Sequence, residues 1–166
     1  MRNFIQKTKS GYTLVEMLFY ITLFCILAIV VINSLITMTK AFKETSIQSD
    51  LVQSSGIMER ISREVRQAYG ISSISTSDLK INTTDDANNI KTERFLLSGS
   101  DVQFFDNDVL TGNLNTTNIQ VTALTFTQIT TTAGKAIKIV LSVKSTRDTA
   151  GRVENFYDTA VLRGAY

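Results

Sequence analysis

The sequence reads Lys-Ser-Gly-Tyr-Thr-Leu-Val-Glu at residues 9–16, and a long apolar run follows at once. Residues 1–11 form a leader that carries three of the chain's basic side chains. From Met17 to Ile32 every residue is apolar except Thr22. The order of basic leader, glycine, single carboxylate and apolar run decides how the rest of the chain is interpreted.

The apolar segment, taken with its flanks, covers residues 12–36. A helix of about 20 apolar residues spans a bilayer, so this segment is predicted to cross a membrane. The cations before it predict a cytoplasmic N-terminus. An ordinary secretory signal peptide has a shorter apolar core followed by a small-x-small cleavage site. Residues 33–40 offer no such site, so the cleavable position is expected before the apolar run.

Glu16 lies inside the apolar segment, five residues after Gly11. A charged side chain at the centre of a membrane helix costs roughly 2.5–3.5 kcal/mol on insertion scales, so such a residue is a functional candidate by default. The alternative is a carboxylate near the interface whose charge reaches the polar headgroups. Position alone leaves both interpretations open.

This stretch resembles the N-terminal signature of type IV prepilins and pseudopilins: a basic leader, glycine, an aromatic residue, Thr-Leu-x-Glu and a long apolar helix. The resemblance covers roughly residues 7–36 strongly and the rest only by architecture. A weaker similarity links residues 57–68 to the helix end of J-type minor pseudopilins and W-type minor pilins. Tyr12 departs from the more usual phenylalanine. The chain also has no proline, which many pilin helices carry, and Asn33-Ser34 is expected to supply a polar weak point instead.

The resemblance implies three events at named residues. A prepilin peptidase would cut between Gly11 and Tyr12, the new amine of Tyr12 would be N-methylated, and Glu16 would pair with the amine of a neighbouring subunit. It also implies a single-pass precursor in the inner membrane that later joins a cell-surface or periplasmic filament. The physics is consistent, because cleavage creates a cation that can neutralise a carboxylate in an apolar bundle.

A helical pattern continues beyond the membrane over residues 37–70. Gly56 weakens this helix, and Gly70 is expected to stop it as a C-cap. One helix over residues 12–69 would be about 87 Å long. Its stripe is predicted to pack on the chain's own sheet, with a partner groove as the alternative. The apolar residues that recur at spacings of three, four or seven are Ile47, Leu51, Met58, Ile61, Val65 and Ala68.

Residues 71–166 change to short alternating segments separated by polar turns, which indicates an antiparallel meander of six to eight strands. A bulge or turn is expected near Ala123. The fold class is therefore α+β: a long N-terminal helix, transmembrane in its N-terminal half, packed across one antiparallel sheet of a single pilin-like domain. The predicted strands cover residues 71–75, 79–82, 90–97, 102–105, 109–110, 119–126, 137–143 and 153–162.

The composition argues against catalysis and against a metal or cofactor site. The chain has no histidine, and its one cysteine, Cys25, lies in the apolar run. No nucleotide, catalytic or zinc motif is present, so no enzyme, cofactor or metal site is predicted. The net charge is +2, and removing the leader cations would leave about −1. Arg60, Arg63 and Arg66 are interleaved with glutamates, so no nucleic-acid partner is predicted.

Two polar loops contain carboxylates that calcium could use, but neither has the spacing that predicts a calcium site. Asp106-x-Asp108 with Gly112 lacks the EF-hand spacing, and residues 85–89 fit no better.

Three functional hypotheses remain at this stage. The first is a minor pilin or pseudopilin whose partners are prepilin peptidase, other pilin or pseudopilin subunits and the inner membrane. The second is a pilus-displayed adhesin or DNA-uptake subunit that uses the loops at Thr83–Asn89 and Asp106–Asn118. The third is a membrane-anchored exoplasmic domain outside any filament.

Overall fold

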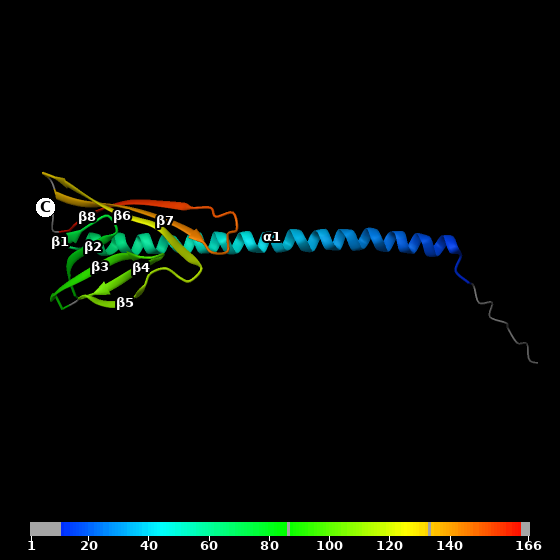
Figure 1. Ribbon diagram of the computed structural model, residues 1–166, viewed down its shortest axis with the longest axis horizontal. Coiled ribbons are helices and arrows are strands. Elements are labelled where there is room, and N and C mark those ends of the chain that lie inside the picture. Colours follow the sequence, from blue (N-terminus) through cyan, green and yellow to red (C-terminus); the bar gives the residue numbers. More distant parts are fainter. Residues whose placement is uncertain (1–10, 86, 133, 164–166) are drawn as a thin grey trace, which may run out of the picture. The chain divides into compact units, whose positions relative to one another are not determined.

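The computed structural model describes residues 11–85, 87–132 and 134–163 of the 166-residue chain (Figure 1). The chain divides into two compact units, Met1–Lys43 and Glu44–Tyr166. One helix, α1 (Leu14–Gln67), belongs to both units, and all strands belong to the second. The strands are β1 (Gly70–Ile74), β2 (Asp78–Thr84), β3 (Ile90–Ser98), β4 (Asp101–Asp106), β5 (Val109–Asn113), β6 (Ile119–Thr131), β7 (Gly134–Ser145) and β8 (Glu154–Val161).

In the first unit, α1 exposes almost every side chain, although most of them are apolar. Its length and hydropathy suffice to cross a membrane. The polar hydroxyls are satisfied within the helix: Thr22, Thr37 and Thr39 each donate to the carbonyl four residues earlier, at 2.8–2.9 Å. Such back-bonding removes the cost of carrying a hydroxyl into an apolar environment.

The expected weak point at Asn33-Ser34 does not interrupt α1, which is helical through both residues. Without a proline, each backbone N–H in this stretch can donate to the preceding turn. The C-terminal end also differs from the prediction. α1 ends at Gln67, and Gly70 is the first residue of β1, paired with Asn82, rather than a left-handed C-cap.

The second unit contains two antiparallel sheets rather than the single expected one. Strands β1–β5 form a five-stranded meander, and β6, β7 and β8 form a separate three-stranded sheet. The chain leaves the first sheet at Asn115, whose amide donates to the Ile119 carbonyl at 2.9 Å and to Asp101 at 2.8 Å. Its side-chain oxygen accepts the Val102 N–H at 2.9 Å. This buried side chain fixes a crossing between the sheets that alternation alone does not reveal.

Within each sheet the predicted strands and turns are confirmed. Ser98 pairs with Asp101 across the β3–β4 turn, where Gly99 adopts a φ of +64°. The expected bulge lies at Thr122, because the β6–β7 register shifts between Val121 and Ala123.

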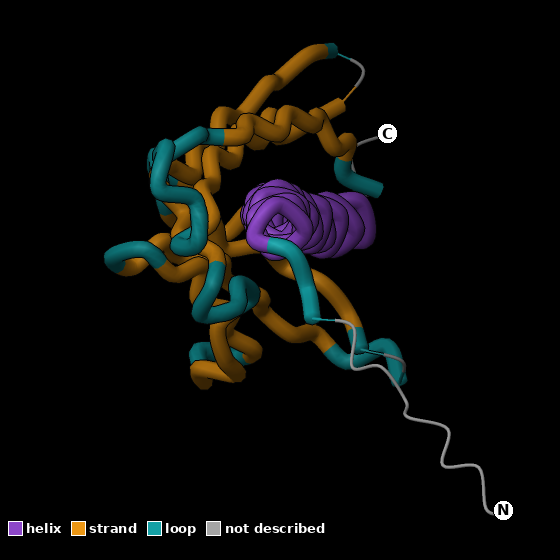
Figure 2. The backbone as a smooth tube through the Cα atoms, turned by 90° about the vertical axis from the view of Figure 1, so that its right-hand side faces the viewer, coloured by secondary structure: helices purple, strands orange, loops and turns teal. Residues whose placement is uncertain are grey.

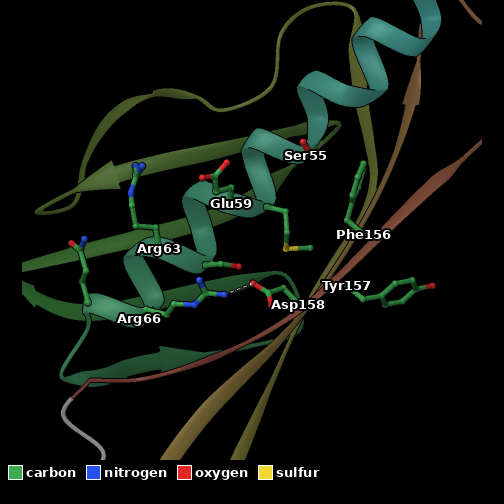
Figure 3. Close-up of a pocket in the computed structure, with 10 residues that line it drawn as sticks. Ser55, Glu59, Arg63, Arg66, Phe156, Tyr157 and Asp158 are labelled. Atoms are coloured by element: carbon green, nitrogen blue, oxygen red, sulfur yellow. Dashed lines mark hydrogen bonds and ion pairs between the residues drawn. The ribbon is translucent and has the colours of Figure 1, made fainter.

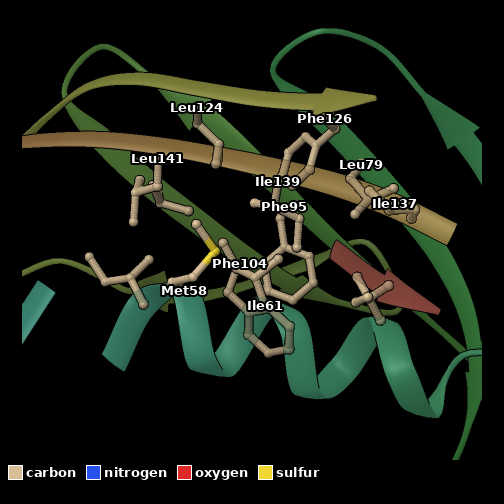
Figure 4. Packing of buried hydrophobic residues seen from close by; sticks show 14 of the residues in the cluster. Met58, Ile61, Leu79, Phe95, Phe104, Leu124, Phe126, Ile137, Ile139 and Leu141 are labelled. Carbon is tan, nitrogen blue, oxygen red and sulfur yellow. The ribbon is translucent and has the colours of Figure 1, made fainter. Parts of the chain in front are cut away.

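The core of the second unit lies between α1 and the two sheets (Figure 4). The predicted helix stripe packs on the chain's own strands: Ile47, Met58, Ile61, Val65 and Ala68 are buried, and Leu51 is partly buried. Phe95 and Phe104 meet beneath it with ring centroids 5.2 Å apart. Figure 2 shows strands around part of the helix circumference, and the α1 residues Val52, Ser55, Glu59 and Arg63 remain exposed.

The β7–β8 loop, residues 146–153, is tied to the first turns of α1 in this unit. Arg152 makes a bidentate contact with Glu44 at 2.8 and 2.9 Å and also binds Asp148 at 2.9 Å. Six residues further along α1, buried Asp50 accepts a hydrogen bond from the Ser145 hydroxyl at 2.7 Å. We call Glu44, Asp148 and Arg152 the loop clamp.

Candidate functional site

The predicted cleavage position lies just before the helix. Gly11, Tyr12 and Thr13 are exposed and non-helical, and α1 begins at Leu14. Gly11 does not have a positive φ, and a Cβ added there would meet no atom within 4 Å. The fold therefore places no demand for glycine at residue 11, so any such demand must come from another molecule.

Thr13 and Glu16 shape the start of α1. The Glu16 N–H donates to the Thr13 hydroxyl oxygen at 3.2 Å, which is the N-cap half of a Thr-x-x-Glu capping box. Glu16 lies in the first turn, where the helix dipole favours a negative charge. The spacing of these two residues thus has a local structural role in addition to any role in assembly.

The Glu16 carboxylate is poorly satisfied within the chain. Within the described part of the chain, its one hydrogen bond comes from the Tyr20 hydroxyl at 3.4 Å, a long contact one turn further along. Among the described residues, no cation pairs with it. Its neighbours Tyr12, Leu14, Val15 and Met17 are exposed apolar side chains. The structure therefore presents a carboxylate without a counter-charge on an apolar helical surface that none of the described residues covers.

The polar loops that were weighed as calcium or ligand sites use their side chains internally. Asp85 accepts the Asn89 N–H at 2.7 Å and its side-chain amide at 2.9 Å, and these bonds lower the pKa of Asp85. Asp86 lies outside the described residues. Asn107 and Asp108 both have positive φ and form the β4–β5 turn, and Asp108 binds Lys80 at 2.8 Å. The described residues contain no cluster of three potential metal ligands.

The three arginines of α1 also have partners on this chain. Arg60 stacks over the Phe104 ring at 4.7 Å, Arg63 meets Glu64 at 3.3 Å and Arg66 meets Asp158 at 3.1 Å. These contacts agree with a solvated, internally paired face. Sequence reasoning missed the burial of Glu93 and the groove beside β8, since neither has a local sequence signal.

The comparisons with known proteins agree with the N-terminal geometry. A family profile described as the prokaryotic N-terminal methylation motif matches residues 6–32. No curated protein and no solved structure matches the chain. The matched residues include the whole Gly-Tyr-Thr-Leu-Val-Glu stretch and the apolar helix that follows it. The chain therefore carries an N-terminal methylation motif, which agrees with its resemblance to the type IV prepilins and pseudopilins.

Proposed function

We propose that the chain is a minor pilin or pseudopilin, a structural subunit of a type IV pilus, a type II secretion pseudopilus or a competence pseudopilus. In this proposal residues 1–11 are the leader, 12–36 the membrane and filament-core helix, 37–70 its amphipathic continuation and 71–166 the β domain. The observation that carries it is Glu16, an uncompensated carboxylate on an apolar surface, five residues after a glycine that the fold does not require.

Cleavage between Gly11 and Tyr12 creates a cation that can pair with the Glu16 carboxylate. Hydrolysis of that peptide bond leaves an amine on Tyr12, which is charged at neutral pH and stays charged after N-methylation. Pairing with the amine of a neighbouring subunit neutralises Glu16 as the apolar helices bundle. The same contact sets the axial register between subunits, because an unpaired carboxylate in an apolar bundle is costly.

The first test is intact-mass and N-terminal analysis of the chain expressed in membranes with a prepilin peptidase. We expect a product that begins at methylated Tyr12, and we expect Gly11→Leu to remain at full length. Gly56→Ala is the matched glycine control, because its Cβ is also unobstructed and it lies far from the cleavage position in the sequence. A chain that retains residues 1–11 beside an active peptidase would refute the processing step.

The second test separates processing from assembly. Glu16→Gln should be cleaved normally but should not enter sheared filaments or crosslinked subunit complexes. Tyr20→Phe removes only the 3.4 Å hydroxyl contact and should assemble like the parent chain. If Glu16→Gln assembles as well as the parent, the pairing role is wrong even if cleavage is intact.

A further inference from the structure

A groove runs between α1 and β8 in the second unit (Figure 3). Its main hollow has a volume of about 590 Å³ and is lined by Met58 and Glu59 of α1 and by Phe156, Tyr157 and Asp158 of β8, among others. A second hollow of about 340 Å³ shares Ser55 and Phe156 with the first and extends to Glu154. We call the two together the α1–β8 groove.

One wall of the groove is the free edge of β8. β8 pairs with β7 on one side only, and the Leu162 N–H donates to the Lys135 carbonyl at 3.1 Å. Because antiparallel bonding alternates along a strand, even-numbered residues of β8 bond to β7. The N–H groups of Asn155, Tyr157 and Thr159 therefore point away from β7.

The outward N–H groups near the C-terminal end are already occupied. Arg163 donates to the Ala68 carbonyl at 3.1 Å, and Thr159 donates to the Asp158 carboxylate at 2.7 Å. Arg66 holds Asp158 in place at 3.1 Å. The Ser62 hydroxyl, the Thr159 N–H and Arg66 together keep the pKa of Asp158 below its usual value. This end of the edge is therefore closed by a charged side chain at neutral pH.

The outward N–H groups of Asn155 and Tyr157 have no partner among the described residues. The opposite edge of the same sheet provides a contrast. There, the Val121 N–H donates to the Ser100 carbonyl at 3.0 Å, and the Phe126 N–H donates to the Thr76 carbonyl at 2.9 Å. The sheet is therefore covered along β6 but open along the first half of β8, which is where an added strand can form main-chain hydrogen bonds.

The charges that line the groove indicate the chemistry of such a strand. Each arginine that lines the groove has an ion-pair partner: Arg63 contacts Glu64, and Arg66 contacts Asp158. Arg152 contacts Glu44 and Asp148. Glu59 and Glu154 also line the groove, and neither has an ion-pair partner in the described part of the chain. Apolar contact surface comes from Phe156 and from the small exposed part of Met58, which is otherwise buried. The unmet charge of the groove is therefore negative: Glu59 lines the first hollow, Glu154 lines the second, and Phe156 lines both.

We propose that the α1–β8 groove binds an extended segment of another polypeptide by strand addition to Asn155 and Tyr157. The segment places apolar side chains against Met58 and Phe156 and basic side chains toward Glu59 and Glu154. The inference does not depend on cleavage after Gly11, because every residue of the groove belongs to the second unit and the test uses the uncleaved chain.

The test is hydrogen exchange, resolved to single amides, on the full-length chain in detergent micelles. The probes are two capped peptides, Lys-Thr-Val-Thr-Val-Thr-Lys and the same peptide with glutamate in place of both lysines. At a concentration ten times its Kd, the basic peptide should slow exchange at the Asn155 and Tyr157 amides about tenfold, in proportion to occupancy. The acidic peptide should leave both rates unchanged.

Two pairs of variants separate the charge from the main-chain contribution. Glu59→Lys should abolish protection by the basic peptide, whereas Gln53→Lys, on the same helix but outside the groove, should not. Tyr157→Pro removes an outward N–H that the β7 ladder does not use, a change that edge strands tolerate, and should also abolish protection. Tyr157→Ala removes the ring, keeps the N–H and should retain protection.

Several results would overturn the proposal. Equal protection by both peptides would remove the charge argument, and absence of protection by either would remove the site. Binding of the basic peptide without a change at Asn155 and Tyr157 would indicate an occupant that does not extend the sheet. Protection that rises with protein concentration, without peptide, would assign the groove to a second copy of the chain.

Discussion

The two parts of α1 share one secondary structure but differ in what their side chains contact. Residues 14–43 expose a continuous apolar surface and make few side-chain hydrogen bonds beyond those to their own preceding turn. Residues 44–67 bury one stripe against two sheets and leave the opposite side polar. Among the described residues, nothing covers the apolar surface of the first part, and under the proposed function lipid or other subunits would cover it. The second part is buried by its own chain.

Glu16 and Glu93 illustrate the same contrast with carboxylates. Glu93 is 2% exposed, and its side chain meets Lys91 at 2.7 Å on its own strand. Glu16 has only the Tyr20 hydroxyl and no cation among the described residues. Glu93 therefore has its counter-charge within its own folded unit. The carboxylate of the apolar segment lacks one, which agrees with a counter-charge supplied by assembly.

The largest expected effect comes from a matched pair of phenylalanines. Phe95 is 0% exposed in the core, whereas Phe24 is 71% exposed on the apolar segment. Phe95→Ala should lower the free energy of unfolding of the β domain by about 3–5 kcal/mol, through lost burial and a cavity. Phe24→Ala should leave it unchanged when denaturation is followed in detergent micelles. A comparable loss in both variants would show that the apolar segment contributes to the stability of the domain.

A second effect is the pH dependence that Glu93 introduces. Burial, opposed in part by Lys91, raises the pKa of Glu93 above the unfolded value of 4.5. The folded state then binds the proton more tightly, so stability should rise as pH falls from neutral toward 4.5. The gain is about 1.4 kcal/mol for each unit by which the pKa is raised. Melting temperatures from pH 8 to pH 5 should show this rise in the parent chain.

Glu93→Gln should flatten that profile, and Glu16→Gln should not change it. A rise that persists in Glu93→Gln would show that Glu93 is not the group that binds the proton.

A smaller effect concerns the helix backbone. Gly56 is exposed within α1, and a Cβ added there meets nothing within 4 Å. Gly56→Ala should therefore stabilise the domain by about 0.5–1 kcal/mol, because alanine loses less backbone entropy in a helix. Gly99→Ala is the opposing control, since its φ of +64° strains any L side chain. A loss of stability in Gly56→Ala would indicate that this glycine has a packing role that the isolated chain does not show.

The smallest expected effect is local loosening of the loop clamp. Arg152 lowers the pKa of both Glu44 and Asp148 through side-chain hydrogen bonds. Groups with lowered pKa values stabilise the fold at neutral pH and lose that contribution as pH falls through their folded pKa values, which lie below the ordinary 4.5 of Glu44 and 3.8 of Asp148. Arg152→Ala should thus speed hydrogen exchange in residues 146–153 at pH 7, and a pH series taken down until both carboxylates are protonated should remove the difference. Unchanged exchange in the variant would mean that the clamp adds nothing to the order of this loop.

Local patterns in the sequence were enough to predict the helix stripe and most strands. Ile137, Ile139, Leu141 and Val143 alternate strictly, and all four are buried as that pattern requires. The division into two sheets was not predictable from alternation, because it depends on which strands pair. The buried Asn115 amide at the crossing contacts Val102 and Asp101, which lie 13 and 14 residues earlier in the sequence. The end of α1 was misplaced since Gly70 resembles a cap, whereas the Arg163 N–H caps the Ala68 carbonyl from the far end of the chain.

The same distinction applies to the candidate sites. Gly11, Tyr12 and Glu16 were proposed from the resemblance of a short contiguous motif to those of type IV prepilins, and their roles stay predictions. The open edge of β8 could not be predicted from the sequence, because it depends on which strands are neighbours and on the outward direction of two backbone N–H groups. Asn155 and Tyr157 carry no mark in the sequence that separates them from other exposed strand residues.

The loop clamp also has a mechanical consequence. Glu44 is the first residue of the β-domain unit, so tension along the helix would enter that unit beside the Arg152 contacts, before it reached Ile47 or Met58. Ionic contacts of this kind yield over a short extension and re-form when the load falls. Under a pulling load, the clamp would therefore act as a reversible first link, and the hydrophobic core behind it would be loaded only after that link had opened.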